Sequence, residues 1–170
     1  QVEKVLQMAQ IENENIELKF NALNLHDLIL DAVINAELKV LAKEGTINTN
    51  LEANKPVIEG DVTHISSIIN NLLDNAEKYT PEKPCILIST KDVKGGVELS
   101  VSDNGIGMSK DAIKNIFEKF YRVHTGNLHD VKGFGLGLSY VKAMVDAHHG
   151  RVGVKSEPGK GSTFTVFLPE

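Results

Sequence analysis

The sequence predicts an α+β fold in which helices cover one face of a β-sheet. Segments with alternating apolar residues and segments with helical periodicity follow each other in mixed order, which favours this architecture. The 170 residues are 41% hydrophobic and 24% charged, a composition typical of a globular chain with one core. This composition excludes a disordered, collagenous or membrane-spanning chain.

Charge and cysteine content exclude several classes of function. The 18 Lys and Arg residues against 23 Asp and Glu residues give a net charge of −5 at pH 7, so we expect no nucleic-acid partner. The single cysteine, Cys85, excludes an intrachain disulfide and a Cys-rich zinc site. Its apolar neighbours predict a buried thiol on a strand. The chain begins with Gln1 instead of Met, so we expect it to be a piece of a longer protein.

The first 45 residues predict two helices and a strand. In residues 1–13, apolar side chains recur at helical spacing, which indicates the end of a longer coiled or hairpin helix or, alternatively, a capped surface helix. Residues 16–20 alternate and predict a strand. Asn24 can cap the next helix, which Gly45 ends. Its apolar stripe comprises Leu25, Leu28, Ile29, Ala32, Val33 and Ala36.

The remaining elements follow from the same two periodicities. A helix is expected from Asp61 to about Tyr79, another over 136–149 and a short one over 109–116. Residues 123–135 lack apolar periodicity and predict a long loop. Strands are expected at 46–51, 55–59, 85–91, 97–103, 151–156 and 162–168.

The helix over 61–79 carries a polar face beside its apolar stripe. At 100° per residue, Asn71, Asn75 and Lys78 lie within roughly 60° of each other. Amide oxygens suit Mg2+, and an ammonium group suits phosphate. The alternative is an ordinary solvated face.

A second candidate site follows the strand over 97–103. Asp103 has the parity of the apolar residues Val97, Leu99 and Val101, so its carboxylate is expected on the apolar side of the sheet. A carboxylate there needs a hydrogen-bond donor, and the amino group of adenine is one. Gly105 and Gly107 allow a flat ligand to approach the backbone closely. An ordinary Asn-Gly turn is the alternative.

Two further motifs flank the long loop. Gly133, Gly135 and Gly137 precede a helix, where backbone N–H groups favour phosphate. The spacing fits neither the dinucleotide fingerprint nor a P-loop, and a flexible hinge is the alternative. The aromatic cluster at 117–122 anchors the other end of the loop and ends in Arg122, which either reaches a phosphate or is a surface charge. The loop itself fits a mobile lid over a phosphate tail.

Together these four motifs resemble the ATP-binding catalytic domain of sensor histidine kinases. In the order of the chain, they are similar to its N box, first glycine box, F box (117–122) and second glycine box (133–138). Residues 159–164 are similar to its closing glycine segment. The resemblance covers about residues 20–170. It implies the Bergerat-type (GHKL) fold, a two-layer α/β sandwich in which a mixed sheet of about five strands is backed by three helices. It also implies that residues 1–15 end a dimerisation hairpin helix and that residues 16–170 form the ATP-binding domain.

The resemblance assigns roles to residues by their positions. Asn75 would ligate Mg2+, Asn71 would support the metal and the phosphates, and Lys78 and Arg122 would contact the phosphate tail. Asn71, Lys78 and Arg122 are therefore the candidate catalytic residues. Asp103 would accept a hydrogen bond from the adenine amine. The other implied ATP contacts are Tyr79, Gly105, Gly107, Met108, Lys132, Gly133, Gly135, Leu136, Gly137, Leu138 and Thr163.

The implied activity is transfer of the γ-phosphoryl group of ATP–Mg2+ to a histidine of a two-component sensor kinase. The implied partners are the protein's own dimerisation domain, which carries that histidine, and the receiver domain of a response regulator. His26-Asp27 mimics the acceptor pair but lies inside the catalytic domain, so the acceptor is not expected in this chain. The chain alone is expected to be a monomer and the full-length protein a homodimer.

The resemblance leaves two other functions open. One is an ATP-driven clamp-type ATPase of the same fold, which would carry a glutamate base where this chain has Asn71. The other is a kinase-like binding module without catalysis. The implied location is the bacterial cytoplasm, with the full-length protein anchored in the inner or plasma membrane. The remaining histidines are expected to be structural, and His148 and His149, at a helix C-terminus, to be partly positive.

Overall fold

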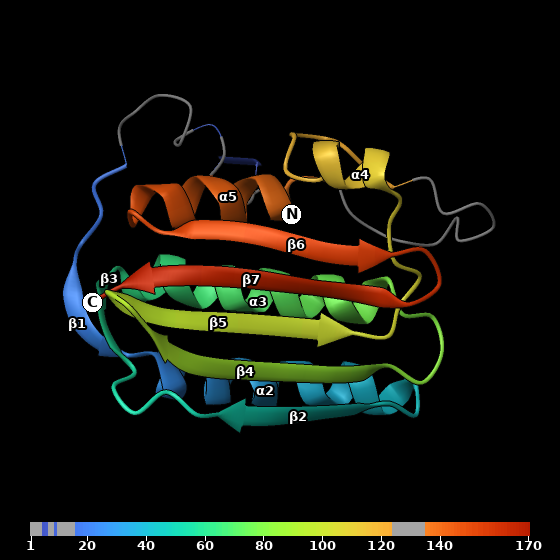
Figure 1. Cartoon of the computed structure of the whole chain (residues 1–170), viewed down its shortest axis with the longest axis horizontal. Coiled ribbons are helices and arrows are strands. Elements are labelled where there is room, and N and C mark those ends of the chain that lie inside the picture. The colour runs from blue at the N-terminus through green and yellow to red at the C-terminus, as the bar shows by residue number, and fades with distance from the viewer. Residues whose placement is uncertain (1–4, 7–8, 10–15, 124–134) are drawn as a thin grey trace.

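The computed structural model describes residues 5–6, 9, 16–123 and 135–170. A five-stranded mixed sheet forms one layer of the fold (Figure 1). The first pair in the sheet is parallel and the others are antiparallel. In spatial order the strands are β2 (Thr46–Leu51), β4 (Cys85–Val93), β5 (Gly96–Asp103), β7 (Gly161–Pro169) and β6 (Arg151–Glu157).

Three helices form the second layer on one face of this sheet (Figure 1). They are α2 (Leu25–Ala42), α3 (Val62–Lys78) and α5 (Gly137–Ala147), and α3 packs between the other two. A short helix, α4 (Lys110–Asn115), follows β5. This arrangement confirms the predicted α+β fold, with its mixed sheet and one helical layer.

Apolar periodicity and side-chain caps explain why these helices form where they do. The apolar stripe of α3 faces the sheet, because Ile65, Ile68, Ile69, Leu72 and Ala76 are all buried. The side chain of Asn24 accepts from the backbone N–H of His26 at the start of α2. Asp61 accepts from the second and third residues of α3 in the same way. The predicted Asn24 cap and the predicted start of α3 at Asp61 are therefore confirmed.

The strand expected at residues 16–20 is wrong. The strand β1 is Asn21–Asn24, which pairs antiparallel with β3 (Val57–Gly60) in a separate two-stranded ribbon. The backbone N–H of Lys19 instead donates to the carboxylate of Asp61 at 2.9 Å. Long-range pairing, and not local alternation, therefore sets the position of this strand.

The expectation of a buried Cys85 is also wrong. Cys85 is exposed, because the side chains of β4 alternate between the two faces of the sheet. Ile86 and Ile88 point into the core, whereas Leu87 is 41% exposed on the same face as Cys85.

The histidines link elements of the fold. His26 Nε2 lies 2.8 Å from Thr90 Oγ1, and His64 Nδ1 lies 2.7 Å from the hydroxyl of Tyr140. His148 is buried; its Nε2 accepts from the Asp61 N–H, and its Nδ1 lies 2.7 Å from the Met144 carbonyl, which assigns the proton to Nδ1. Burial lowers the pKa of His148. The expected partly positive imidazole is therefore wrong for His148, because desolvation outweighs the helix terminus.

Of residues 1–15, the structure describes Val5, Leu6 and Ala9, all helical. No helix in the described part of the chain is long and apolar enough to cross a membrane.

Candidate functional site

The candidate site lies at one end of the two-layer fold. There the C-terminus of α3, the C-terminus of β5, the N-terminus of α5 and the turn between β6 and β7 come together, at the right in Figure 1. Each of these helix ends, strand ends and turns carries one of the motifs found in the sequence.

The polar face of α3 meets the first turn of α5. Asn71, Asn75 and Lys78 are all half-buried. The Asn71 amide nitrogen donates to the Ser67 carbonyl at 2.7 Å. A Cβ atom on Gly137 would lie only 3.1 Å from Asn71 Oδ1, so this glycine lets the backbone of α5 approach the asparagine face. The structure therefore brings Asn71 and Gly137 together, as the predicted site requires.

Asp103 ends β5 and is held by two backbone donors. Its Oδ1 accepts from the N–H of Gly105 at 2.8 Å and from the N–H of Ser162 at 3.3 Å. Burial raises the pKa of Asp103 above its ordinary value, although these two N–H donors act in the opposite direction. The carboxylate is thus oriented and half-buried, and it is suited to a ligand that brings its own donor.

The glycines after Asp103 allow close backbone packing. A Cβ on Gly105 would lie 2.4 Å from the Tyr79 carbonyl oxygen. Gly107 has a φ of +66°, and a Cβ there would lie 1.8 Å from the Glu157 carbonyl oxygen. The Ile106 N–H also donates to the Tyr79 carbonyl at 3.0 Å. The loop after β5 therefore rests on the end of α3 on one side and on the β6–β7 turn on the other.

The segment after α4 contacts Gly135 of the second glycine motif. The Phe117 ring packs edge-on against Phe164, with ring centroids 6.4 Å apart. The Phe120 N–H donates to the Gly135 carbonyl at 3.1 Å, and Gly135 has a φ of +73°. Arg122 is exposed. The structure thus places both ends of the predicted loop side by side.

Several predicted contact residues belong to the core or lie outside the described residues. Met108, Leu136 and Leu138 are buried, so their side chains support the site from the core. Lys132 and Gly133, with most of the predicted lid, lie outside the residues that the structure describes.

The structure brings Ser162, and not Thr163, next to Asp103. Ser162 is paired with Asp103 across β5 and β7, and its hydroxyl lies 2.8 Å from Ser156 Oγ. The Thr163 hydroxyl instead lies 2.9 Å from Ser102 Oγ, on the other face of the sheet. The sequence held a signal for this, because Ser162 has the same parity as the buried residues Phe164, Val166 and Leu168.

The site offers an amide oxygen, on Asn75, of the kind that suits Mg2+. Among the described residues, no group of three or more His, Cys, Asp or Glu side chains could hold a metal ion. Mg2+ usually keeps several waters and takes only one or two protein ligands beside substrate phosphates. The half-buried amide of Asn75 on α3 is compatible with that role.

Comparison with known proteins identifies the family of this chain. Residues 60–170, which contain every motif described above, match the family model for the histidine kinase-, DNA gyrase B- and HSP90-like ATPases. The chain belongs to this family. Its relatives over the whole chain are sensor proteins, histidine kinases among them, so it is identified as the catalytic domain of a sensor histidine kinase.

These relatives match almost all of the kinase domain. It is 47% identical to the sensor protein RprX of Bacteroides fragilis over 99% of this chain, which is 33% of RprX. It is 30% identical to the sensor-like histidine kinase SenX3 of Mycolicibacterium smegmatis over 98% of this chain and 43% of SenX3. The chain therefore spans a third to less than half of the length of these relatives.

Solved histidine kinases have the same fold. The catalytic domain of the histidine kinase ThkA superposes with a TM-score of 0.78 and 26% identity, covering 89% of this chain and 97% of that domain. Full-length ShkA, solved in complex with AMPPNP, superposes with a TM-score of 0.85 and 29% identity, covering 99% of this chain and 35% of ShkA.

Proposed function

We propose that this domain binds ATP–Mg2+ and transfers the γ-phosphoryl group to a histidine on the dimerisation domain of a two-component sensor kinase. The observation that carries the proposal is the half-buried Asp103 carboxylate, which two backbone N–H groups orient at the end of β5. An oriented acceptor beside close-packed glycines suits the exocyclic amine and the flat ring of adenine. The complex of the similar protein ShkA with AMPPNP supports an adenine nucleotide.

The face of α3 supplies groups for the phosphate end of the same nucleotide. Asn75 would ligate Mg2+ through its amide oxygen, and Asn71 would support the metal and the phosphates. Lys78 and Arg122 would offset the phosphate charge. Gly135 and Gly137, together with Gly133, would contribute backbone N–H groups at the start of α5.

On the adenine side, we place Ser162 beside Asp103. Its N–H donates to Asp103 Oδ1, the oxygen that also accepts from the Gly105 N–H. Tyr79, Gly105, Gly107 and Met108 would complete the nucleoside side of the site. Leu136 and Leu138 would support it from the core, and Lys132 would contact the phosphates from the lid. We assign Thr163 no direct contact.

The domain would contribute to the reaction mainly by positioning the reactants and neutralising the phosphate charge. A bond forms between an imidazole nitrogen of the acceptor and the γ-phosphorus, the bond from the γ-phosphorus to the bridging oxygen breaks, and ADP leaves. The proton of the attacking nitrogen passes to a base outside this chain. The acceptor histidine would belong to the dimerisation domain. Within this chain, His26 is instead held by a hydrogen bond to Thr90.

We further propose that residues 1–15 end the dimerisation helix and that residues 16–170 are the ATP-binding domain. The full-length protein would then be a homodimer with this domain in the bacterial cytoplasm and an anchor in the inner or plasma membrane. Its phosphoryl group would pass to the receiver domain of a response regulator.

The test uses radiolabelled ATP with two proteins, the 170-residue chain and the full-length sensor protein that carries it. We expect the full-length protein to acquire an acid-labile label on histidine and its Asn75→Ala variant to lose that label. We expect the chain alone to bind ATP, to hydrolyse it slowly and to remain unlabelled. Strong labelling of the chain alone would contradict the proposal. Fast hydrolysis by the chain would indicate a clamp-type ATPase, and absence of ATP binding would indicate a module without catalysis.

A further inference from the structure

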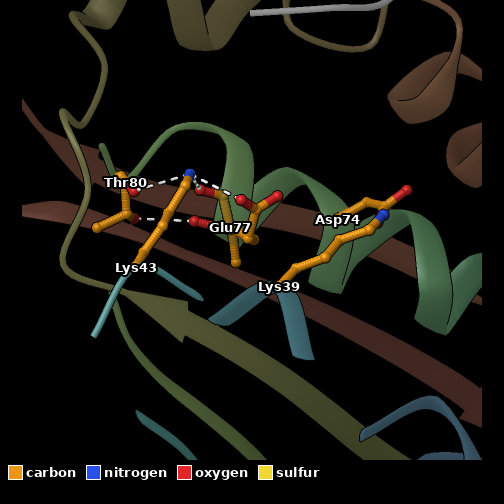
Figure 2. Close-up of polar contacts among 6 residues, drawn as sticks. Lys39, Lys43, Asp74, Glu77 and Thr80 are labelled. Carbon is orange, nitrogen blue, oxygen red and sulfur yellow. Dashed lines mark hydrogen bonds and ion pairs between the residues drawn. The ribbon is translucent and has the colours of Figure 1, made fainter. Parts of the chain in front are cut away.

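A lysine at the end of α2 binds the end of α3 through three acceptors (Figure 2). Lys43 Nζ lies 2.7 Å from Glu77 Oε1, 2.8 Å from the Glu77 carbonyl oxygen and 3.3 Å from the Thr80 carbonyl oxygen. An ammonium group has three N–H donors, so these acceptors can use all of them. The side chains of Lys43 and Glu77 are only 28% and 13% exposed. Solvent therefore screens this contact less than it screens a surface ion pair.

The Lys43 contact supplies hydrogen-bond donors to carbonyl groups at the C-terminal end of α3. The last carbonyls of a helix lack intrahelical partners, and a cation near them is favourable. The Thr80 hydroxyl donates to the Ala76 carbonyl at 2.8 Å, and the Lys43 carbonyl accepts from the Lys83 N–H at 3.1 Å. Side chain and backbone of Lys43 thus both hold the segment that leaves α3.

The segment held by Lys43 supports the nucleotide site directly. The Tyr79 carbonyl in this segment accepts a hydrogen bond from the Ile106 N–H, in the loop that follows Asp103. Gly105 packs against the same carbonyl and against Thr80 Oγ1. A shift of residues 77–80 would therefore move the loop that carries the proposed adenine contacts. It would also move Lys78, on the last turn of α3.

We propose that Lys43 is a positioning residue for nucleotide binding. It does not touch the nucleotide. It fixes the end of α3, and through the Tyr79 carbonyl it fixes the loop after Asp103. This inference rests on the proposed function, because the effect is measured as ATP affinity.

The same two helices contain a matched control. One turn earlier, Lys39 Nζ lies 3.5 Å from Asp74 Oδ1, and Figure 2 shows this pair beside the Lys43 contact. These side chains are 61% and 36% exposed. Lys39→Met removes the same charge from the same helix as Lys43→Met. It leaves the end of α3 untouched.

The experiment compares the dissociation constant of ATP–Mg2+ for both variants by calorimetry at 15 °C, where circular dichroism verifies that they are folded. For Lys43→Met we expect roughly a three- to tenfold increase in Kd, the size of a modest coupling between neighbouring residues. For Lys39→Met we expect a change of less than about twofold, as for an exposed ion pair. Lys43→Arg keeps a cation with several donors, so it should recover part of the lost affinity.

A further variant separates an effect on positioning from an effect on stability. Ile29→Val removes a buried methyl group near the other end of α2, so it should lower the melting temperature without changing Kd. If Lys43→Met does not fold at 15 °C, Glu77→Gln with Asp74→Asn as its control takes its place, and Glu77→Gln should raise Kd more.

Three results are distinguishable. If the unmodified chain does not bind ATP, the proposed function fails. If the unmodified chain binds ATP and the Lys43 variants, or Glu77→Gln in their place, bind it as tightly as their controls, the positioning role is overturned. A lower melting temperature with unchanged Kd would also overturn it, because Lys43 would then be structural only.

Discussion

At the scale of single residues, Asp103 is where binding and stability conflict. Its carboxylate is half-buried, and burial raises its pKa. Folding therefore favours the protonated acid, so the free energy of unfolding falls as the pH rises from the ordinary pKa to the raised one. The proposed adenine contact needs the ionised acceptor. We infer that this cost to stability is retained for nucleotide selectivity.

Asp103→Asn tests this conflict. The Gly105 and Ser162 N–H groups would hold the amide oxygen in the place of Oδ1, so the amide NH2 would face the adenine amine. We expect the ATP affinity to fall roughly tenfold or more, with loss of the preference for ATP over GTP. At pH 8 the free energy of unfolding should equal or exceed that of the unmodified chain. Calorimetry and urea unfolding measure these quantities, and an unchanged nucleotide preference would refute the role of Asp103.

The pH dependence of binding gives a second prediction for the same residue. The affinity of the unmodified chain for ATP should decrease as the pH falls through the raised pKa of Asp103, because the protonated acid loses its acceptor. The decrease should begin at a higher pH than for an ordinary aspartate, and Asp103→Asn should abolish this part of it. Titrations at several pH values, corrected for protonation of ATP itself, provide the measurement. A pH dependence identical in both proteins would contradict the prediction.

At the scale of elements, α3 could be predicted almost completely from the sequence, because its determinants are local. Asp61 caps it, its apolar stripe is regular, and it ends before Tyr79. The strand β1 could not be predicted, because Asn21–Asn24 has no distinctive pattern and forms only by pairing with β3. The Lys43 contact was likewise hidden, because its partner Glu77 lies 34 residues away along the chain.

Strand parity explains where the side chains of Asp103, Thr163 and Cys85 lie. The parity of β5 placed the Asp103 carboxylate correctly. Applied to β7, the same rule selects Ser162 over Thr163, and applied to β4 it places Cys85 on the open face. For Cys85, strand parity is a better guide than its apolar neighbours.

The loop after β5 depends on Gly107. With a φ of +66° and the Glu157 carbonyl in the way of a Cβ, Gly107→Ala should lower the free energy of unfolding by roughly 2–4 kcal/mol. Gly153 on β6 is the matched control, since a Cβ there meets nothing within 4 Å. Gly153→Ala should be neutral or slightly stabilising. Urea unfolding of both variants tests the prediction, and equal stabilities would contradict it.

At the scale of the whole molecule, the two ends of the fold differ in purpose. The end with Asp103 carries the candidate site. At the other end, buried His148 joins α5 to the cap of α3 through the Asp61 N–H, and the Phe20 ring lies 5.1 Å from it. Residues 16–20 enter the domain here, where the Lys19 N–H donates to the Asp61 carboxylate.

This second end predicts how stability depends on pH. Because burial lowers the pKa of His148, its contribution is complete above the unfolded value of about 6.5 and is lost as the pH falls below it. Burial also lowers the pKa of His26, which adds to the same trend. The free energy of unfolding should therefore be lower at pH 5.5 than at pH 7.5. His148→Gln should reduce this difference, whereas His149→Asn, at an exposed position, should leave it unchanged. A stability that does not vary between these pH values would contradict the assignment.

Asn75→Ala tests whether the helix layer supplies a ligand to Mg2+. The variant should fold as the unmodified chain does, because Asn75 is only half-buried on the site face of α3. Its affinity for ATP should no longer increase when Mg2+ is added, since the proposed amide ligand is gone. An unaltered response to Mg2+ would show that the metal is held elsewhere.

The central claim is that the ends of α3, β5 and α5 together form a site for ATP–Mg2+. A calorimetric titration of the 170-residue chain with ATP, in the presence and absence of Mg2+, tests it most directly. The account predicts saturable binding with one nucleotide per chain that strengthens when Mg2+ is present. Absence of binding under both conditions would contradict it.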